Sequence, residues 1–332
     1  MNVPLRELLK ETSRSFYLTL RVLPSQVRSQ IGLAYLLART ADTIADTEII
    51  PLGQRLGALQ QFRDRILGLR NVLLDFTEIA NQQSDPAERL LLEKCDASLA
   101  QLRDLSADDL QRVREVLKTI ISGQELDLKR FAHVSFESSI LALQNETELD
   151  DYTYRVAGCV GEFWTKICRA HLFPRAKLDE SRLLREAVRF GQGLQLVNIL
   201  RDLPADLRKG RCYLPADKLA QEGLQAGDLL QPLNHIRFKP LYHRYLDQAE
   251  AHLAAGWKYT NTIPRSQIRV RLACAWPILI GIETIRRLRK ENVLDATQKV
   301  KISRTDVRRI IVRSVLCYPS ANAWKRLAPL PV

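Results

Sequence analysis

Two segments of the chain combine an apolar surface with a narrow polar stripe at helical spacing. In the segment 195–206, Gln195, Asn198, Asp202 and Asp206 recur at steps of three, four and four, which places their side chains along one line of a helix. The positions between them are mostly leucine, isoleucine and valine. Because a helix that is apolar on nearly every side is normally buried, we expect this polar stripe to face an interior space.

A second stripe of the same kind lies near the N-terminus. Tyr35, Arg39, Asp42 and Asp46 step by four, three and four, and leucine and isoleucine residues again fill the positions between them. Two carboxylates one helical turn apart repel each other, and burying them without a partner is costly. We therefore expect positive charge in the space that each stripe faces.

The remaining pattern also favours helices. We predict one helix from a capping Ser25 to about Thr47 and another that starts with Ser84 as its cap. Ser106 and Ser303 are each followed three residues later by aspartate, and both are expected to cap a helix. Apolar and polar residues nowhere alternate between turn signals, so strands should be rare.

The organisation of the chain is predicted to be simple. No linker divides it, and one all-α domain over residues 1–332 with an irregular tail at about 319–332 is the simplest account. The apolar run 272–282 is too short to span a bilayer and is expected to be a buried helix. Pro204 should kink or end the second striped helix near Leu203.

Composition and charge narrow the classes of function. The chain has 332 residues, of which 46% are hydrophobic and 27% charged, as in soluble globular proteins. Its net charge of +12 fits a polyanionic substrate or an anionic membrane surface. The basic residues are scattered and no nucleic-acid motif is present, so we expect no nucleic-acid partner. Six cysteines without a CxxC spacing indicate a cytoplasmic protein, with peripheral contact to the inner face of the membrane left open.

The two stripes suggest a particular chemistry. Carboxylate and amide oxygens suit Mg²⁺, which binds through one or two carboxylates together with substrate phosphates. Arg39, Arg201 and Arg211 supply positive charge for phosphate oxygens. A solvated helix face would explain a single aspartate pair, but two matching stripes favour a site that holds a diphosphate through Mg²⁺. Apolar walls behind it would suit a hydrocarbon tail. Gly191 and Gly193 form a lone GxG inside a helical pattern, which favours a close helix contact over a nucleotide-binding loop.

Five stretches of the chain resemble the squalene/phytoene synthase family of head-to-head prenyl synthases. They are SRSF at 13–16, YLLARTADTIAD at 35–46, GQELDL at 123–128, YRVAGCVG at 154–161 and QLVNILRDLPADLRKGRCYLP at 195–215. The likeness is greatest to the soluble bacterial squalene synthases. It implies an all-α isoprenoid synthase bundle with a central cavity.

The resemblance also implies roles for individual residues. The residues expected to bind Mg²⁺ are Asp42, Asp46, Asn198, Asp202 and Asp206. The residues expected to be catalytic are Asp42, Asp46, Asp202, Asp206 and Tyr35. The expected substrate contacts are Ser13, Arg14, Ser15, Arg39, Tyr154, Gln195, Asn198 and Arg201, joined by Arg211 from the basic loop after the second stripe. Lys301 falls where squalene synthases carry a basic segment associated with NADPH.

The implied reaction joins two molecules of farnesyl diphosphate, through presqualene diphosphate, into squalene with reduction by NADPH. Three related outcomes stay open: dehydrosqualene synthesis, phytoene synthesis, and arrest at presqualene diphosphate in a hopanoid pathway. A function of a different class is a non-catalytic, membrane-associated helical assembly factor. The expected partners are farnesyl diphosphate, with downstream isoprenoid enzymes as further candidates.

Overall fold

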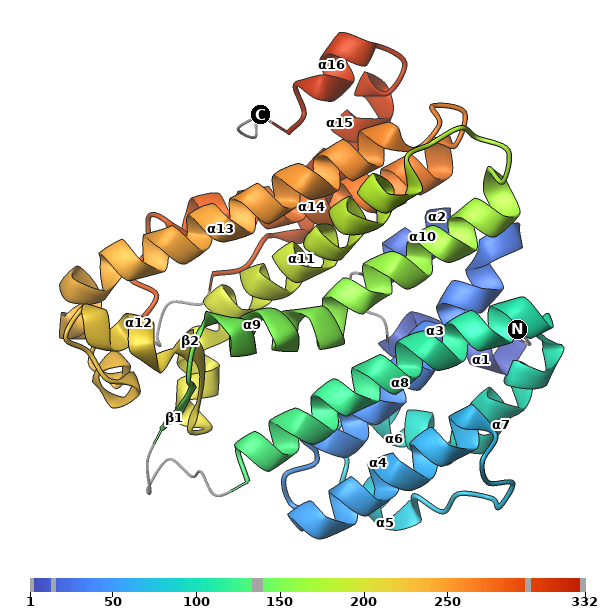
Figure 1. The fold of residues 1–332 in the computed structure, drawn as a ribbon, viewed down its shortest axis with the longest axis horizontal. Coiled ribbons are helices and arrows are strands. Elements are labelled where there is room, and N and C mark those ends of the chain that lie inside the picture. The colour runs from blue at the N-terminus through green and yellow to red at the C-terminus, as the bar shows by residue number, and fades with distance from the viewer. Residues whose placement is uncertain (1–2, 13–15, 133–139, 296–299, 329–332) are drawn as a thin grey trace. The chain divides into compact units, whose positions relative to one another are not determined.

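The computed structural model describes residues 3–12, 16–132, 140–295 and 300–328 (Figure 1). It divides into two compact units. Unit 1 comprises residues 1–132 and 162–176, and unit 2 comprises 133–161 and 177–332. This division alone does not decide how many domains the chain forms, so the single domain over 1–332 stays a prediction.

Unit 1 is built from helices. They are α1 (Val3–Thr12), α2 (Phe16–Val22), α3 (Ser25–Asp46), α4 (Leu52–Leu67), α5 (Thr77–Asn81), α6 (Pro86–Glu93), α7 (Cys95–Ala100), η1 (Gln101–Asp104), α8 (Ala107–Arg130) and the later part of α10 (Cys159–Leu172). Helix α3 packs against α4, α6, α7 and α8. Its leucine and isoleucine side chains are almost fully buried, which makes α3 the central helix of this unit.

The helix starts in unit 1 test the predicted caps. The hydroxyl of Ser106 accepts a hydrogen bond from the amide of Asp109, so that cap is confirmed. Ser25 is not a cap, because Pro24 occupies the capping position and the helix begins one residue later. Ser84 is not a cap either. Asp85 takes that role by accepting from the amide of Ala87, with proline at the first helical position, where a missing N–H has no consequence.

Unit 2 holds the other elements. They are β1 (Leu141–Leu143), α9 (Glu146–Thr153), η2 (Tyr154–Gly158), the start of α10, α11 (Glu180–Arg208), β2 (Arg211–Pro215), α12 (Ala216–Gln221), η3 (Ala226–Leu230), η4 (Pro232–Asn234), α13 (His235–Thr262), α14 (Ile268–Leu288), α15 (Arg304–Cys317) and α16 (Ala321–Lys325). Helices α11, α13 and α14 run side by side (Figure 1). Strands β1 and β2 form a short parallel pair, so strands are rare within the described residues, as expected.

Two predictions for unit 2 need correction. Helix α11 does not end near Leu203 but continues through Pro204 to Arg208, because Leu203 and Leu207 are buried on either side of the proline and keep this turn packed. The alternative, a kink at Pro204, stays a prediction. The expected irregular tail contains helix α16. It forms because Trp324 is buried and stacks on Trp257 of α13 at 5.2 Å between ring centroids.

The glycine pair in α11 marks a close helix contact, as expected. A Cβ atom at Gly191 would lie 2.2 Å from the carbonyl oxygen of Ala157, and one at Gly193 would lie 2.7 Å from Cβ of His252 in α13. These approaches leave no room for a side chain, so glycine is required by packing and not by a nucleotide.

The apolar run 272–282 lies in the buried part of α14, as predicted. Ser303 caps α15 by accepting from the amide of Asp306, which confirms that cap too. Within the described ranges, no helix has both the length and the apolar character needed to cross a bilayer.

Candidate functional site

The polar stripe of unit 1 forms as the sequence predicts. On α3, Tyr35, Arg39 and Asp42 are half-buried and Asp46 is exposed, while the apolar residues between them are buried except for the half-buried Ala38. The stripe is therefore a line of partly accessible polar groups on the largely buried C-terminal half of this helix.

Arg39 is held between two acidic side chains. One of its amino groups forms an ion pair with Glu88 of α6, and the other lies 4.0 Å from Asp42. Burial lowers the pKa of Arg39, but the charges of Asp42 and Glu88 more than offset this, and the pKa is raised above its usual value. Arg39 is thus a fixed positive charge beside the first aspartate pair.

Asp42 has a specific support from a second helix. Gln124 of α8 donates a hydrogen bond from its amide nitrogen to a carboxylate oxygen of Asp42. Desolvation, followed by repulsion from Asp46, raises the pKa of Asp42 to about 7. The Asp42 side chain is still 45% exposed, so a cation that arrives from outside unit 1 could reach it. The carboxylate therefore favours the arrival of further positive charge.

Tyr35 connects the stripe to the end of α1. Its hydroxyl donates to the carbonyl oxygen of Thr12 at 3.3 Å. Ser13, Arg14 and Ser15, which the resemblance assigns to the substrate, come directly after Thr12 in the sequence and lie outside the described residues. Their roles stay predictions.

The stripe of unit 2 also forms on a buried helix. Gln195, Asn198, Asp202 and Asp206 are all half-buried on α11. The leucine, isoleucine and valine residues between them are buried, whereas the proline at 204 is half-buried and the alanine at 205 is exposed. The spacing that suggested one line of polar side chains thus matches the exposure that the structure gives them.

Asp202 already has a cationic partner. The guanidinium of Arg201 donates to both carboxylate oxygens, at 2.9 and 2.5 Å, although the Asp202 side chain is 48% exposed. This hydrogen bond raises the pKa of Arg201, burial lowers it, and the charges of Asp202 and Asp206 raise it further. The positive charge that the sequence predicts beside this stripe is therefore present as Arg201.

Two other predicted contacts lie close to α11 in the fold. Arg211 opens β2 directly after Gly210, whose φ of 76° allows the chain to turn from the helix into the strand. Tyr154 begins η2, a π-helical turn that packs on α11. Single π-helical turns are frequent at functional sites, and no residue type in this segment signalled one in advance.

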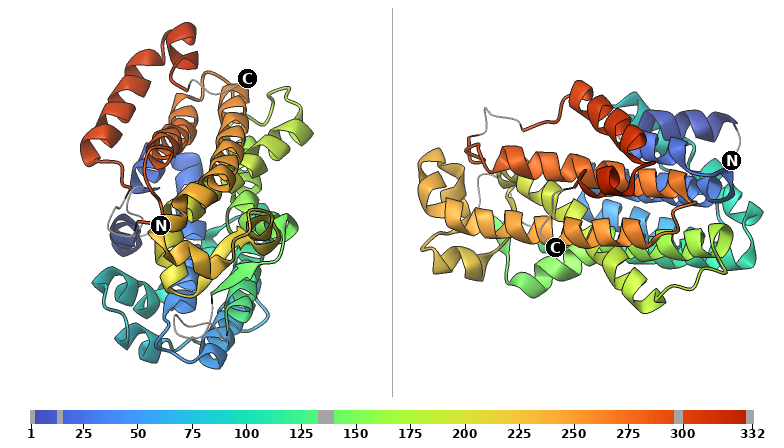
Figure 2. Two further views of the ribbon diagram at one scale, coloured as in Figure 1. Left: turned by 90° about the vertical axis from the view of Figure 1, so that its left-hand side faces the viewer. Right: turned by 90° about the horizontal axis from the view of Figure 1, so that it is seen from above.

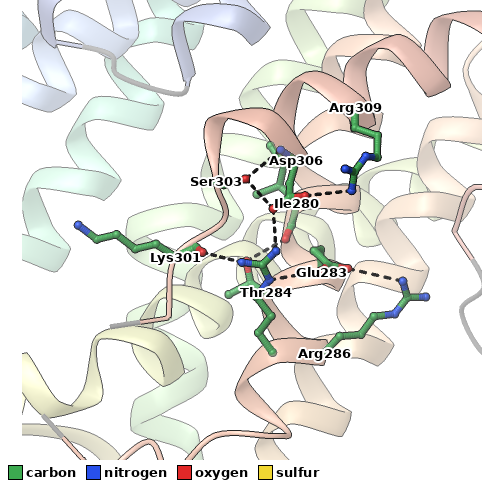
Figure 3. A network of polar contacts seen from close by, with 9 residues as sticks. Ile280, Glu283, Thr284, Arg286, Lys301, Ser303, Asp306 and Arg309 are labelled. Atoms are coloured by element: carbon green, nitrogen blue, oxygen red, sulfur yellow. Dashed lines mark hydrogen bonds and ion pairs between the residues drawn. The ribbon is translucent and has the colours of Figure 1, made fainter. Parts of the chain in front are cut away.

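Lys301 lies in a segment that an ion-pair network fixes in place (Figure 3). Arg287 of α14 donates to the backbone carbonyl of Lys301 at 2.8 Å, to Asp306 at 2.7 Å and to Glu283 at 3.3 Å. The Lys301 side chain is exposed and points away from this network (Figure 3). Its ammonium group is thus presented on a fixed backbone, as an anion-binding residue would be.

The two stripes lie in different compact units. The α3 stripe lies in unit 1 and the α11 stripe in unit 2, so a common cavity stays a prediction. Among the described residues, no three His, Cys, Asp or Glu side chains are arranged to hold a metal ion. The donor set nevertheless fits Mg²⁺, because a carboxylate with a raised pKa favours a cation and Mg²⁺ commonly completes its shell with phosphate and water oxygens.

The sequence profile of the squalene/phytoene synthase family matches residues 9–306. The chain belongs to this family. Members of the squalene/phytoene synthase family condense prenyl diphosphates head to head.

Individual relatives are similar over most of the chain. It is 30% identical over 255 residues to the presqualene diphosphate synthase of Rhodopseudomonas palustris, and the match covers 77% of each protein. It is 28% identical over 314 residues to the bifunctional lycopene cyclase/phytoene synthase of Phaeosphaeria nodorum. That match covers 92% of this chain and 48% of the relative, so the chain spans about half the length of that protein.

The fold resembles solved structures of the family. A crystal structure of a dehydrosqualene synthase in complex with ligand matches with a TM-score of 0.67 at 23% identity, covering 94% of this chain and 95% of that chain. At this identity the likeness carries the fold alone. The predicted all-α isoprenoid synthase fold is therefore confirmed.

Sequence reasoning missed the residues that position the stripes. Glu88 carries no sequence signal beyond its place in the first turn of α6, yet it pairs with Arg39. Gln124 was part of a matching motif without a role, yet it holds Asp42. In the same motif, Glu125 forms a two-pronged ion pair with Arg63 of α4 at 2.7 and 2.8 Å, which gives it a structural role.

Proposed function

We propose that this family member joins two molecules of farnesyl diphosphate head to head, through presqualene diphosphate, to squalene. The aspartate pairs on two buried helices, each with a neighbouring arginine, are the observation that carries this proposal. Membership of the squalene/phytoene synthase family supports the same class of reaction.

The metal in this proposal is Mg²⁺. When bound, it supplies the positive charge that helps a diphosphate group leave an allylic carbon. Asp42 and Asp46 would hold it on α3, and Asn198, Asp202 and Asp206 on α11. Gln124 keeps the Asp42 carboxylate in one orientation, which limits the reorganisation needed when a cation binds.

The arginines act on the diphosphate itself. Arg39 and Arg201 are held in the charged form by their acidic neighbours, so both present donors to phosphate oxygens over the whole physiological pH range. Arg211 lies on the strand next to the end of α11. In the structure, Arg39 and Arg201 donate to carboxylate oxygens. Diphosphate oxygens are also anionic acceptors, so they could take the place of these carboxylates as partners of the two guanidinium groups.

The last step requires a hydride, which NADPH supplies when bound. Lys301 is the residue we assign to it, because its exposed ammonium group suits a phosphate and its backbone is fixed by Arg287. In the described part of the chain, Lys301 forms no ion pair that would compete for this contact.

A second candidate is a synthase that stops at presqualene diphosphate. The relative from Rhodopseudomonas palustris favours it, since that match covers more than three quarters of both proteins. Dehydrosqualene or phytoene synthesis would result if the final cation loses a proton or if geranylgeranyl diphosphate is the substrate.

The test is incubation of the full chain with farnesyl diphosphate and Mg²⁺, with and without NADPH, and product analysis by mass spectrometry. Squalene that forms only with NADPH supports the proposal. Presqualene diphosphate or dehydrosqualene in both reactions supports a family alternative, and preference for geranylgeranyl diphosphate supports phytoene synthesis. If no pyrophosphate is released from either substrate, the protein is not a prenyl synthase.

A further inference from the structure

The C-terminal part of unit 2 carries an unusual share of the positive charge. Residues 300–328 contain a single acid, Asp306, and seven bases: Lys301, Arg304, Arg308, Arg309, Arg313, Lys325 and Arg326. This segment therefore has a net charge of +6, which is half of the +12 of the whole chain.

Helix α15 displays much of this charge on one outer face. Its inner face packs on α14 (Figure 2). On that face the buried Ser314 accepts a hydrogen bond from the indole of Trp276 at 2.9 Å. Arg304, Arg308, the valine at 312 and Leu316 succeed each other at steps of four and are all exposed. Leu316 is 74% exposed, and the valines at 312 and 315 beside it are exposed as well. The outer face is thus basic in its first turns and apolar in its last.

The charge of this face is not neutralised within the described residues. Arg304, Arg308 and Arg313 form no ion pair there. The single acid, Asp306, is already engaged by Arg287 at 2.7 Å and by Arg309 at 3.1 Å. The outer face of α15 therefore keeps a positive potential that an external anion can meet.

Another exposed apolar patch in unit 2 shows that exposure alone does not distinguish α15. At η4 and the start of α13, Leu233 is 90% exposed and Ile236 is 82% exposed. The surrounding residues 216–239 contain three bases and three acids, so they have no net charge. Of these two patches, that on α15 alone joins exposed aliphatic side chains to an excess of arginine.

We propose that the outer face of α15 binds the surface of an anionic phospholipid bilayer. The arginines would contact headgroup phosphates, and the exposed aliphatic residues of the last two turns would enter the boundary with the acyl chains. An acidic protein surface would satisfy the arginines but offers no reason for an adjoining aliphatic end. The proposal does not depend on the reaction, because binding needs neither substrate nor metal.

The first test reverses charge at two places with the same change in net charge. The full chain is sedimented with phosphatidylcholine vesicles that contain or lack phosphatidylglycerol, without substrate and at increasing salt. Each basic residue near such a surface contributes on the order of 1 kcal/mol, so Arg304→Glu/Arg308→Glu should weaken binding to anionic vesicles at least about tenfold. The control Arg175→Glu/Lys177→Glu changes two exposed bases outside residues 300–328 by the same net charge and should stay within about twofold of the original protein.

The second test separates the aliphatic contribution. Val315→Ser/Leu316→Ser should weaken vesicle binding severalfold, whereas Leu233→Ser/Ile236→Ser should not. Circular dichroism and thermal melting establish that each variant is folded. Equal loss in variant and control, equal binding to vesicles without phosphatidylglycerol, or no vesicle binding at all overturns the proposal. Sedimentation velocity without vesicles tests one further outcome. If the original protein is a dimer and the α15 variants are monomers, a second copy of the chain covers this face and the proposal is overturned.

Discussion

Helices α3 and α11 each carry two aspartates four residues apart but hold them in different ways. Asp42 is oriented by Gln124 from another helix, and Arg39 stands 4.0 Å away. In Asp202, both carboxylate oxygens accept hydrogen bonds from Arg201, the preceding residue in the sequence. One carboxylate is therefore positioned but still favours a cation, whereas the other is already neutralised locally. Two aspartate pairs with the same spacing can therefore differ in how readily their carboxylates bind a metal ion.

The largest expected effect comes from removing either carboxylate. Asp42→Asn and Asp202→Asn should each lower turnover of farnesyl diphosphate by about a thousandfold or more, since both are predicted to hold the metal that drives ionisation. Pyrophosphate release measures this, and circular dichroism should show an intact fold. Asp108→Asn, an exposed aspartate of α8, is the control and should leave turnover unchanged. Near-normal turnover in either variant would contradict the metal role on that helix.

A large loss of stability is expected when a glycine of α11 is replaced by alanine, but not when a glycine of α4 is replaced in the same way. Gly191→Ala would place a Cβ atom 2.2 Å from the carbonyl oxygen of Ala157, so backbone must move, and we expect a loss of about 2–4 kcal/mol in the free energy of unfolding. Gly57→Ala on α4 meets nothing within 4 Å and should be neutral or stabilising by up to about 1 kcal/mol. Urea titrations of both variants give the comparison, and equal stability of the two would contradict it.

A smaller effect on Mg²⁺ affinity is expected from removing the hydrogen bond that orients Asp42. Gln124→Leu removes the donor to Asp42, so the apparent Mg²⁺ affinity or turnover should fall about 10–100-fold, as is typical when a residue that orients a metal ligand is lost. Gln111→Leu on the same helix replaces an exposed glutamine whose only partner among the described residues is Glu115, and it serves as the control. Turnover at several Mg²⁺ concentrations distinguishes weakened metal binding from a slower reaction. Unchanged Mg²⁺ dependence in Gln124→Leu would show that α3 needs no such support.

The smallest effect concerns how the free energy of unfolding depends on pH through His252, which lies on α13. Burial, assisted by the charge of Arg189, lowers the pKa of His252 to about 4. The folded protein therefore keeps this imidazole neutral while the unfolded chain takes up a proton below about 6.5, so stability is lost as pH falls from 6.5 towards 4. His252→Gln should reduce the loss between pH 7.5 and 5 by about 1–2 kcal/mol, measured by urea titration at both values. An identical loss in variant and parent would refute this assignment.

The sequence predicted the features that depend on local spacing. Both stripes, the Ser106 cap and the glycine contact of α11 arise from helical periodicity or from the special backbone of glycine. The Asp42–Gln124 bond joins residues 82 positions apart and depends on how α3 packs on α8, which no local pattern contains. The helix does not end at Pro204 for a related reason, because the packing on either side of it outweighs the local preference of proline.

The π-helical turn at Tyr154–Gly158 carries one more residue than a regular turn would need. The wider turn absorbs this residue. If the same residues formed a regular α-helix, the extra residue would rotate α9 by about 100° relative to the start of α10. Tyr152, which stacks on Tyr213 at 4.7 Å, would then face a different direction, while Gly158 would keep its close contact with α11. The π-helical turn therefore keeps Tyr152 directed at Tyr213 although the segment is one residue longer than a regular helix would allow.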